Sequence, residues 1–150
     1  MATIERAHAC DRAAIERVVT AAYTPYIARN GAVPGPMRDD YAAYIEAGYA
    51  NVLRDEAGEI AGVLVLIPEA ESMMLDNVAV DPAAHGKGYG RLLLDHAEAE
   101  ARALGFHRIR LYTQVIMTEN QAIYAKRGYI ETHRIHEKGL HRVYMEKRLD

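Results

Sequence analysis

The stretch of the sequence best suited to chemistry is residues 78–94, VAVDPAAHGKGYGRLLL, where a strand pattern passes through a loop into a leucine-rich helix. Pro82 ends the strand, and three glycines alternate in the loop, at Gly86, Gly88 and Gly90. Without a Cβ atom, glycine lets backbone N–H groups approach a ligand closely. These N–H groups lie where a helix begins, so they lack intrahelical partners and the helix dipole is positive there. The pattern predicts an anion site, most naturally for a phosphate or pyrophosphate.

Two better-known phosphate motifs do not fit this loop. A P-loop requires GxxxxGK followed by Ser or Thr, and the sequence has no such run. A dinucleotide fingerprint requires GxGxxG, but Arg91 stands where the third glycine should be. Lys87 and Arg91 add positive charge to the loop. The alternative is a glycine-rich turn without a ligand, because short glycine patterns also arise by chance.

A second group of residues lies in the segment 117–129, MTENQAIYAKRGY. Asn120 and Tyr124 are four residues apart, so they share one face if the segment is helical. An amide and a phenol on one face can orient a ligand and donate a proton to it. The alternative is a helix in which Tyr124 packs into the core and Asn120 only lies near the cap.

The elements that must position these residues alternate along the chain. Pro25 is expected to interrupt the first helix, and residues 26–38 are expected to form a loop or a broken helix. Gly48, Gly105 and Gly128 end the other helices. The patterns predict strands at Thr3–Ala7, Ala50–Arg54, Glu59–Ile67, Ser72–Val80, Arg108–Thr113, Tyr129–Ile135 and His141–Arg148, with a turn around Lys138-Gly139 between the last two. They predict helices at Asp11–Tyr23 with Asp11 as N-cap, from a cap at Asp39 or Asp40 to Gly48, at Tyr89–Leu104, and at Glu119–Arg127. In the helix Tyr89–Leu104, Leu104 is expected on the apolar stripe and Glu98 away from it.

Composition excludes several classes of protein. The 150 residues are expected to form one domain, spanning 1–150, with an ordinary share of apolar residues. A net charge of −3 gives no basic field for nucleic acid or for an anionic membrane surface. The single cysteine, Cys10, rules out an intrachain disulfide, so a cytoplasmic location is expected. None of the seven histidines shows the spacing of a metal motif, so no metal site is predicted.

Taken together, the two motifs resemble those of the GNAT superfamily of N-acetyltransferases. Residues 85–90 are similar to its acetyl-CoA loop, R/Q-x-x-G-x-G/A, and residues 120–129 to its second motif. His85 departs from the pattern, which usually has arginine or glutamine there. The resemblance implies a single-domain α+β fold: a mixed, mostly antiparallel sheet of about six or seven strands with a central parallel pair and about four flanking helices.

The resemblance also implies roles for individual residues. The strand before the loop would offer backbone groups to the pantetheine arm of acetyl-CoA, and the loop would wrap its pyrophosphate. Asn120 would bind the pantetheine, and Tyr124 would protonate the departing CoA thiolate. The implied cofactor-binding residues are Val78, Ala79, Val80, His85, Gly86, Lys87, Gly88, Tyr89, Gly90, Arg91, Asn120 and Tyr124.

The implied reaction is direct attack of a neutral amine on the thioester carbonyl, without an acetyl-cysteine intermediate. The acceptor would be a small molecule or a peptide amino-terminus, with Tyr26 and Asp76 as candidate substrate residues. Asp76, Glu119 or a water chain could serve as the base.

Two other functions compete with this interpretation. One is a non-catalytic acyl-CoA-binding sensor or partner protein with the same fold, and the other is a nucleotide-binding module. Many members of the family form dimers, so a homodimer is a further expectation.

Overall fold

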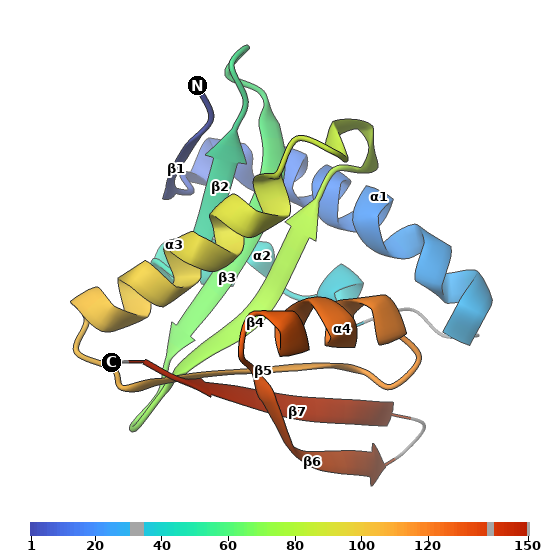
Figure 1. Cartoon of the computed structure of the whole chain (residues 1–150). Coiled ribbons are helices and arrows are strands. Elements are labelled where there is room, and N and C mark those ends of the chain that lie inside the picture. Colours follow the sequence, from blue (N-terminus) through green and yellow to red (C-terminus); the bar gives the residue numbers. More distant parts are fainter. Residues whose placement is uncertain (31–34, 138–139, 150) are drawn as a thin grey trace. The chain divides into compact units, whose positions relative to one another are not determined.

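The computed structural model describes residues 1–30, 35–137 and 140–149, which form an α+β structure (Figure 1). The strands of the described residues are β1 (Thr3–Arg6), β2 (Ala50–Arg54), β3 (Ile60–Pro68), β4 (Met73–Val80), β5 (Arg108–Gln114), β6 (Ile130–Glu137) and β7 (Leu140–Arg148). The α-helices are α1 (Arg12–Asn30), α2 (Tyr41–Ala47), α3 (Tyr89–Ala103) and α4 (Thr118–Lys126). In the same described residues three short 3-10 helices accompany them, η1 (Ala9–Asp11), η2 (Gly35–Arg38) and η3 (Pro82–Ala84).

The strands form one mixed sheet in the order β1-β2-β3-β4-β5-β7-β6. Strands β4 and β5 are parallel, whereas the pairs β1–β2, β2–β3, β5–β7 and β6–β7 are antiparallel. The predicted fold class, with a parallel pair inside a mostly antiparallel sheet, is therefore confirmed. A helix connects β4 to β5, as a parallel neighbour requires.

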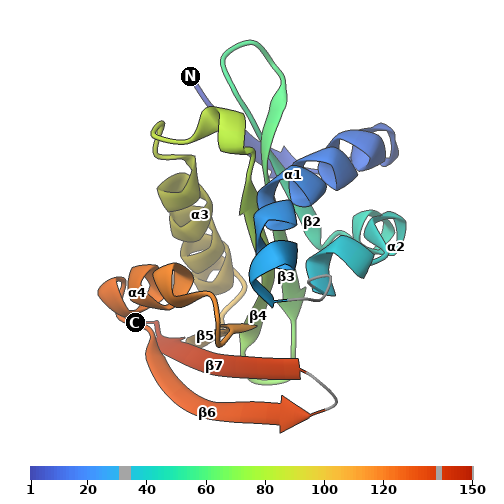
Figure 2. The same cartoon turned by 90° about the vertical axis from the view of Figure 1, so that its right-hand side faces the viewer.

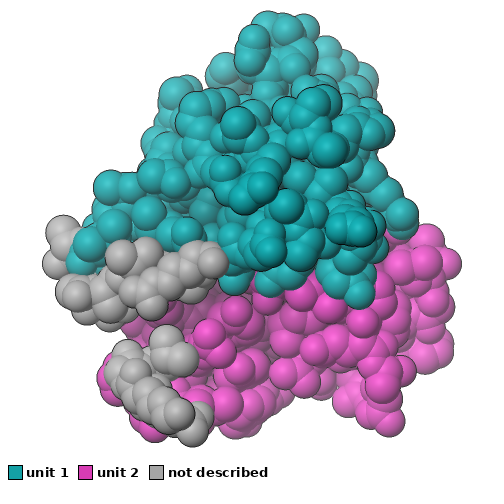
Figure 3. Space-filling view, turned by 180° about the vertical axis from the view of Figure 1, so that it is seen from behind, with its two compact units in different colours: residues 1–66, 77–97 teal, residues 67–76, 98–150 magenta. Residues whose placement is uncertain are grey.

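The chain divides into two compact units, coloured separately in Figure 3. Unit 1 comprises residues 1–66 and 77–97, and unit 2 comprises residues 67–76 and 98–150. Strands β3 and β4 and helix α3 each contribute residues to both units. The expectation of one domain over residues 1–150 stays a prediction.

In unit 1, helix α3 lies on one face of β2 and β3, and α1 and α2 lie on the other (Figures 1 and 2). The apolar strand β3 is buried along nearly its whole length, because helices cover both of its faces. A Cβ atom on Gly62 would lie 3.0 Å from Leu93 Cδ1 of α3. The glycine thus allows close packing between this helix and the strand.

The first helix differs from its prediction. Pro25 lies inside α1, which continues to Asn30, so the expected break at this proline is wrong. Proline removes one helical hydrogen bond, but apolar side chains of α1 such as Ile15 and Val18 are fully buried, and this packing holds the helix. Asp11 is the last residue of η1 rather than the N-cap of α1, and its carboxylate accepts a hydrogen bond at 2.8 Å from the N–H of His8, the N-cap of η1. Of the predicted loop at 26–38, residues 31–34 lie outside the described part of the chain.

The second helix follows its prediction. Asp40 is its N-cap and accepts a hydrogen bond from the Ala43 N–H, and Gly48 ends it in the left-handed conformation. These two local signals were sufficient to predict where α2 begins and ends, because an aspartate cap and a left-handed glycine act within a few residues.

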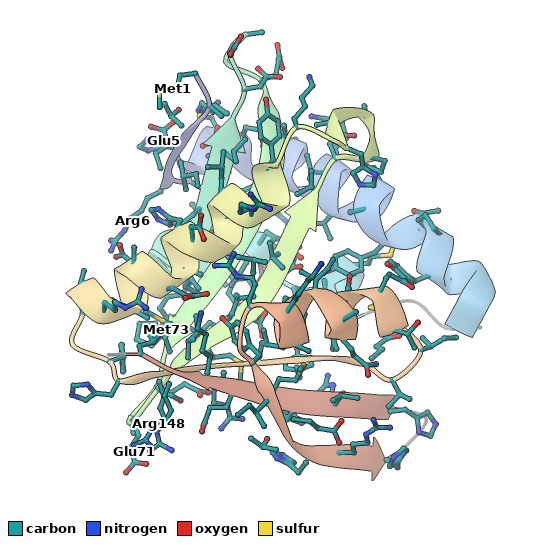
Figure 4. The ribbon with its side chains drawn as sticks, viewed as in Figure 1. Met1, Glu5, Arg6, Glu71, Met73 and Arg148 are labelled. Carbon is teal, nitrogen blue, oxygen red and sulfur yellow. The ribbon has the colours of Figure 1, made fainter. Side chains whose placement is uncertain are left out.

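Unit 2 contains the antiparallel strands β5, β7 and β6, together with α4. Met73, labelled in Figure 4, opens the parallel ladder opposite Ile109, and this ladder continues to the pair Leu75 and Leu111. Strand β5 continues along β7 as far as Gln114. The predicted turn at 138–139 lies outside the described residues.

Two side chains of α3 differ from the helical pattern. Leu104, expected on the apolar stripe, is 52% exposed because α3 ends one residue before it. Glu98, expected on the polar face, is buried in unit 2. Its carboxylate lies 2.9 Å from Arg127 Nη2 and 2.8 Å from Lys147 Nζ. Buried charges are normally paired in this way.

Candidate active site

The glycine loop of unit 1 has the backbone geometry that the sequence predicted. Gly86 and Gly88 have φ angles of +85° and +78°, in the left-handed region that favours glycine. Upstream, Asp81 Oδ1 accepts a hydrogen bond from the Ala83 N–H at 3.0 Å and so caps η3. Downstream, the Leu92 N–H donates to the Gly88 carbonyl at 3.2 Å, the bond that begins α3.

The N–H groups of this loop are suited to an anion. Within the described residues, the N–H groups of residues 86–91 donate no backbone hydrogen bond outside α3, and the first bond into the helix comes from Leu92. They lie at the positive end of the α3 dipole. Residues 85–88 and Arg91 are exposed, so Lys87 and Arg91 add their charges at an accessible surface. These groups fit the diphosphate of a nucleotide-like ligand.

The end of β4 has a backbone edge turned away from β3. The Asp81 N–H donates to the Ala61 carbonyl at 2.9 Å, so Asp81 directs its backbone groups toward β3. Because neighbouring residues of a strand direct theirs to opposite edges, Val78 and Val80 direct N–H and C=O groups away from β3. Ala79 directs its backbone groups toward β3, and its side chain is buried.

Beside this edge is a hydrogen-bonded network that was not predicted from the sequence. The Tyr23 hydroxyl of α1 lies 2.6 Å from Asn77 Oδ1 and 3.3 Å from the Val78 carbonyl oxygen. Asn77 Nδ2 donates to the Tyr41 hydroxyl of α2 at 3.0 Å. The signal in the sequence was an asparagine inside an apolar strand, since a buried amide must be hydrogen-bonded.

In unit 2, α4 places Asn120 and Tyr124 on one face, as predicted from their spacing. Tyr124 is buried, and its ring contacts the Tyr129 ring edge-on with the centroids 5.8 Å apart. Asn120 is half-buried, and its Nδ2 lies 3.6 Å from Met117 Sδ. The helix thus combines an accessible amide with a phenol fixed by core packing.

The two candidate substrate residues belong to different units. In unit 2, the Asp76 carboxylate lies 3.5 Å from the Tyr112 hydroxyl. In unit 1, the half-buried Tyr26 ring lies beside Tyr23, with centroids 6.3 Å apart. Glu119, the other candidate base, is exposed in the first turn of α4.

A hollow in unit 2 lies apart in the sequence from both motifs and is lined by His107, Arg108, Glu146 and Arg148. Arg108 is paired there with Glu146 and with Glu71, at 3.7 Å in each case. Figure 4 labels Glu71 and Arg148 at this end of the unit. Paired, exposed charges of this kind are ordinary surface ion pairs.

Metal-ligand clusters and membrane-spanning helices are both absent from the described residues. Among residues 1–30, 35–137 and 140–149, no three His, Cys, Asp or Glu side chains gather in a way that could hold a metal ion. No helix in the same residues has the length and apolar character needed to span a membrane.

Comparison with known proteins assigns the family. Residues 14–129 match the Acetyltransferase (GNAT) family, a span that includes both the glycine loop and α4. The chain belongs to this family. The resemblance seen in the two sequence motifs is therefore confirmed.

Individual GNAT proteins are similar to this member of the family. The uncharacterized N-acetyltransferase YjgM of Escherichia coli strain K12 is 31% identical over 127 residues, covering 79% of this chain and 76% of that protein. Mycothiol acetyltransferase of Beutenbergia cavernae is 33% identical over 70 residues, 47% of this chain but only 24% of that protein. The structure of YncA from Salmonella typhimurium, a putative acetyltransferase with its cofactor acetyl-CoA, is 25% identical with a TM-score of 0.77, covering 100% of this chain and 95% of that one.

Membership of the GNAT family establishes the class of enzyme. The chain is an N-acetyltransferase, and acetyl-CoA is its acyl donor. The geometry of the glycine loop agrees with this assignment. At the N-terminus of α3 the loop offers N–H groups that donate no backbone hydrogen bond among the described residues.

Proposed function

We propose that this GNAT enzyme transfers the acetyl group of acetyl-CoA directly to a primary amine of a small molecule or of a peptide amino-terminus. The observation that carries the proposal is the loop of unit 1, where Gly86 and Gly88 adopt left-handed φ angles immediately before α3. Such a backbone presents N–H groups to a diphosphate at a helix N-terminus, and at Gly86, Gly88 and Gly90 no Cβ atom stands in the way.

In unit 1 the loop residues bind the diphosphate, and the β4 edge binds the pantetheine arm. The Val78 N–H and both backbone groups of Val80 point away from β3, as an added extended ligand requires, and the Val78 carbonyl is not part of this pairing. His85 stands where the family usually has arginine or glutamine, so it supplies a hydrogen bond with less charge. Backbone groups therefore carry most of the affinity for the diphosphate.

In unit 2 we assign roles to Asn120 and Tyr124 from their places in the second family motif. Asn120 hydrogen-bonds an amide of the pantetheine arm, and its half-buried amide leaves it accessible for this role. Tyr124 is the general acid. Its ring is fixed against Tyr129, so its hydroxyl has a defined position.

The reaction forms one N–C bond and breaks the C–S bond of the thioester. A neutral amine attacks the carbonyl carbon, the backbone N–H groups at the end of β4 polarise the carbonyl oxygen, and Tyr124 gives its proton to the leaving sulfur. Such N–H donors typically contribute about 3–4 kcal/mol. The amine loses its proton to a base, for which Asp76, Glu119 and a water chain remain the candidates. Cys10 is exposed and unpaired with another cysteine, and the mechanism does not use it.

Several finer assignments belong to the same proposal. Asp76 and Tyr26 are proposed as neighbours of the acceptor, a homodimer as the assembly, and the cytoplasm as the location. The proposed location rests on cysteine usage, since a chain with one cysteine has no intrachain disulfide, as is usual in a reducing compartment.

A CoA-release assay over a panel of primary amines tests the proposal, after calorimetry has established that acetyl-CoA binds. Release of CoA that depends on the amine supports direct transfer. Binding of acetyl-CoA without release for any amine would instead support the non-catalytic sensor with the same fold. Affinity for ATP or NAD without affinity for CoA would support a nucleotide-binding module.

A further inference from the structure

The network around Asn77 has a fixed direction. The Tyr41 hydroxyl donates to the Pro36 carbonyl, so it must accept from Asn77 Nδ2. This arrangement leaves Asn77 Oδ1 as an acceptor, and the Tyr23 hydroxyl donates to it at 2.6 Å. Asn77 and Tyr41 are both 2% exposed, so the whole arrangement is locked inside unit 1.

The direction of this network determines what the Tyr23 oxygen can do. A hydroxyl has one proton and two lone pairs. The Tyr23 proton lies in the short hydrogen bond to Asn77 Oδ1. The hydrogen bond from Tyr23 to the Val78 carbonyl oxygen, at 3.3 Å, is therefore weak. Tyr23 Oη and Val78 O therefore form two neighbouring acceptors.

The position of the two acceptors is also defined. The Val78 carbonyl points away from β3, toward the edge on which we propose the acyl group is held. Tyr23 is half-buried, so its hydroxyl lies at the border between the locked network and the surface. Two oxygen acceptors about 3 Å apart match two N–H donors on one nitrogen.

We propose that Tyr23 Oη and Val78 O together bind the amino group of the acceptor, an inference that rests on the proposed function. Each oxygen accepts one N–H of a neutral primary amine, which turns the nitrogen lone pair away from both oxygens. Asn77 and Tyr41 are positioning residues, because they hold the Tyr23 proton away from the incoming nitrogen. A secondary amine, with a single N–H, can satisfy only one of the two oxygens.

The test compares glycinamide with its N-methyl analogue sarcosinamide as acceptors. Loss of one hydrogen bond corresponds to up to about tenfold in kcat/KM, so the wild type is expected to prefer glycinamide by about this factor. Tyr23→Phe is expected to lower kcat/KM for glycinamide and bring the ratio of the two acceptors close to one, with the Kd of acetyl-CoA unchanged. Tyr44→Phe, on α2, is the matched control and keeps the wild-type ratio.

A binding measurement makes the test independent of turnover. Glycinamide is titrated calorimetrically into the complexes of wild type and Tyr23→Phe with CoA, and weaker binding to the variant is expected. An unchanged acceptor ratio in Tyr23→Phe, equal glycinamide affinities, or no glycinamide binding to the wild-type complex would each overturn the inference. Failure of the proposed function is a distinct result, in which acetyl-CoA itself does not bind or no amine of the panel is acetylated.

Discussion

Glu98 Oε2 of α3 accepts a hydrogen bond from Arg127 Nη2 at 2.9 Å, and Arg127 is the residue that closes α4. The contact ties the end of α3 in unit 2 to the helix that carries Tyr124. Lys147 of β7 joins the same carboxylate at 2.8 Å, and Arg102 lies 3.9 Å from it. A buried carboxylate thus connects two helices and a strand of unit 2.

Removal of Glu98 is expected to destabilise the enzyme. Glu98→Ala leaves the partly buried cations of Arg127 and Lys147 without their counter-charge, and breaking a buried pair in this way costs about 3–5 kcal/mol. Urea unfolding measures the loss of unfolding free energy. The control is Glu16→Ala, which removes an exposed i,i+4 pair with Arg12 and should cost about 0.5 kcal/mol or less. Equal losses for the two variants would contradict a structural role for Glu98.

The buried Tyr129 predicts a loss of stability at high pH. Burial, and secondarily the nearby Glu98 carboxylate, raises the pKa of Tyr129 well above its ordinary value. The folded state therefore keeps this proton above pH 10 while the unfolded state releases it, so stability is full below about pH 10 and falls above it.

Tyr129→Phe is expected to remove this part of the alkaline loss, which amounts to about 1.4 kcal/mol per pH unit. Among the described residues the Tyr129 hydroxyl is buried without a hydrogen-bond partner, so the variant should be at least as stable as wild type at pH 7. Urea unfolding between pH 7 and 11 makes the comparison. Parallel curves for the two proteins above pH 10 would refute the assignment.

Tyr124→Phe is expected to lower kcat while leaving the affinity for acetyl-CoA close to that of wild type. A general acid typically contributes about 10²-fold or more, and a phenyl ring keeps the packing against Tyr129. Steady-state kinetics with the best amine of the panel gives kcat, and calorimetry gives the Kd. A variant with unchanged kcat would rule out the acid role.

Gly88→Ala is expected to weaken acetyl-CoA binding. Its φ of +78° costs an alanine about 1–2 kcal/mol, so the loop must shift and the affinity should fall about tenfold. Gly58→Ala is the control, because Gly58 has a φ of +83° in the turn between β2 and β3. The control should lose similar stability and bind acetyl-CoA normally. If both variants bound equally well, the loop geometry would not matter for affinity.

Local signals in the sequence were enough to predict the loop, α2 and α4. A proline after a strand, glycines in a loop and an aspartate cap act over a few residues, so they do not depend on the rest of the fold. Most predicted strand boundaries agree with the structure within one or two residues for the same reason. The resemblance to the family then supplied the parallel pair inside a mostly antiparallel sheet, whereas the order of the strands came from the structure.

Features that depend on tertiary packing were not predicted. Helix α1 continues through Pro25 because its buried face outweighs one lost hydrogen bond. Asn77 and Glu98 have polar side chains, which periodicity assigns to the surface, yet both are buried with partners from distant segments. No local pattern specifies such partners, so the Tyr23 network emerged only from the structure.

The central claim is that the N–H groups of residues 86–91 bind the diphosphate of acetyl-CoA. Amide NMR spectra of the ¹⁵N-labelled enzyme, titrated separately with CoA and with pantetheine, test it most directly because pantetheine lacks the diphosphate. The account predicts that CoA shifts the amide signals of residues 86–91 strongly and that pantetheine leaves them almost unchanged. Saturating CoA that shifted other amides but not these would contradict it.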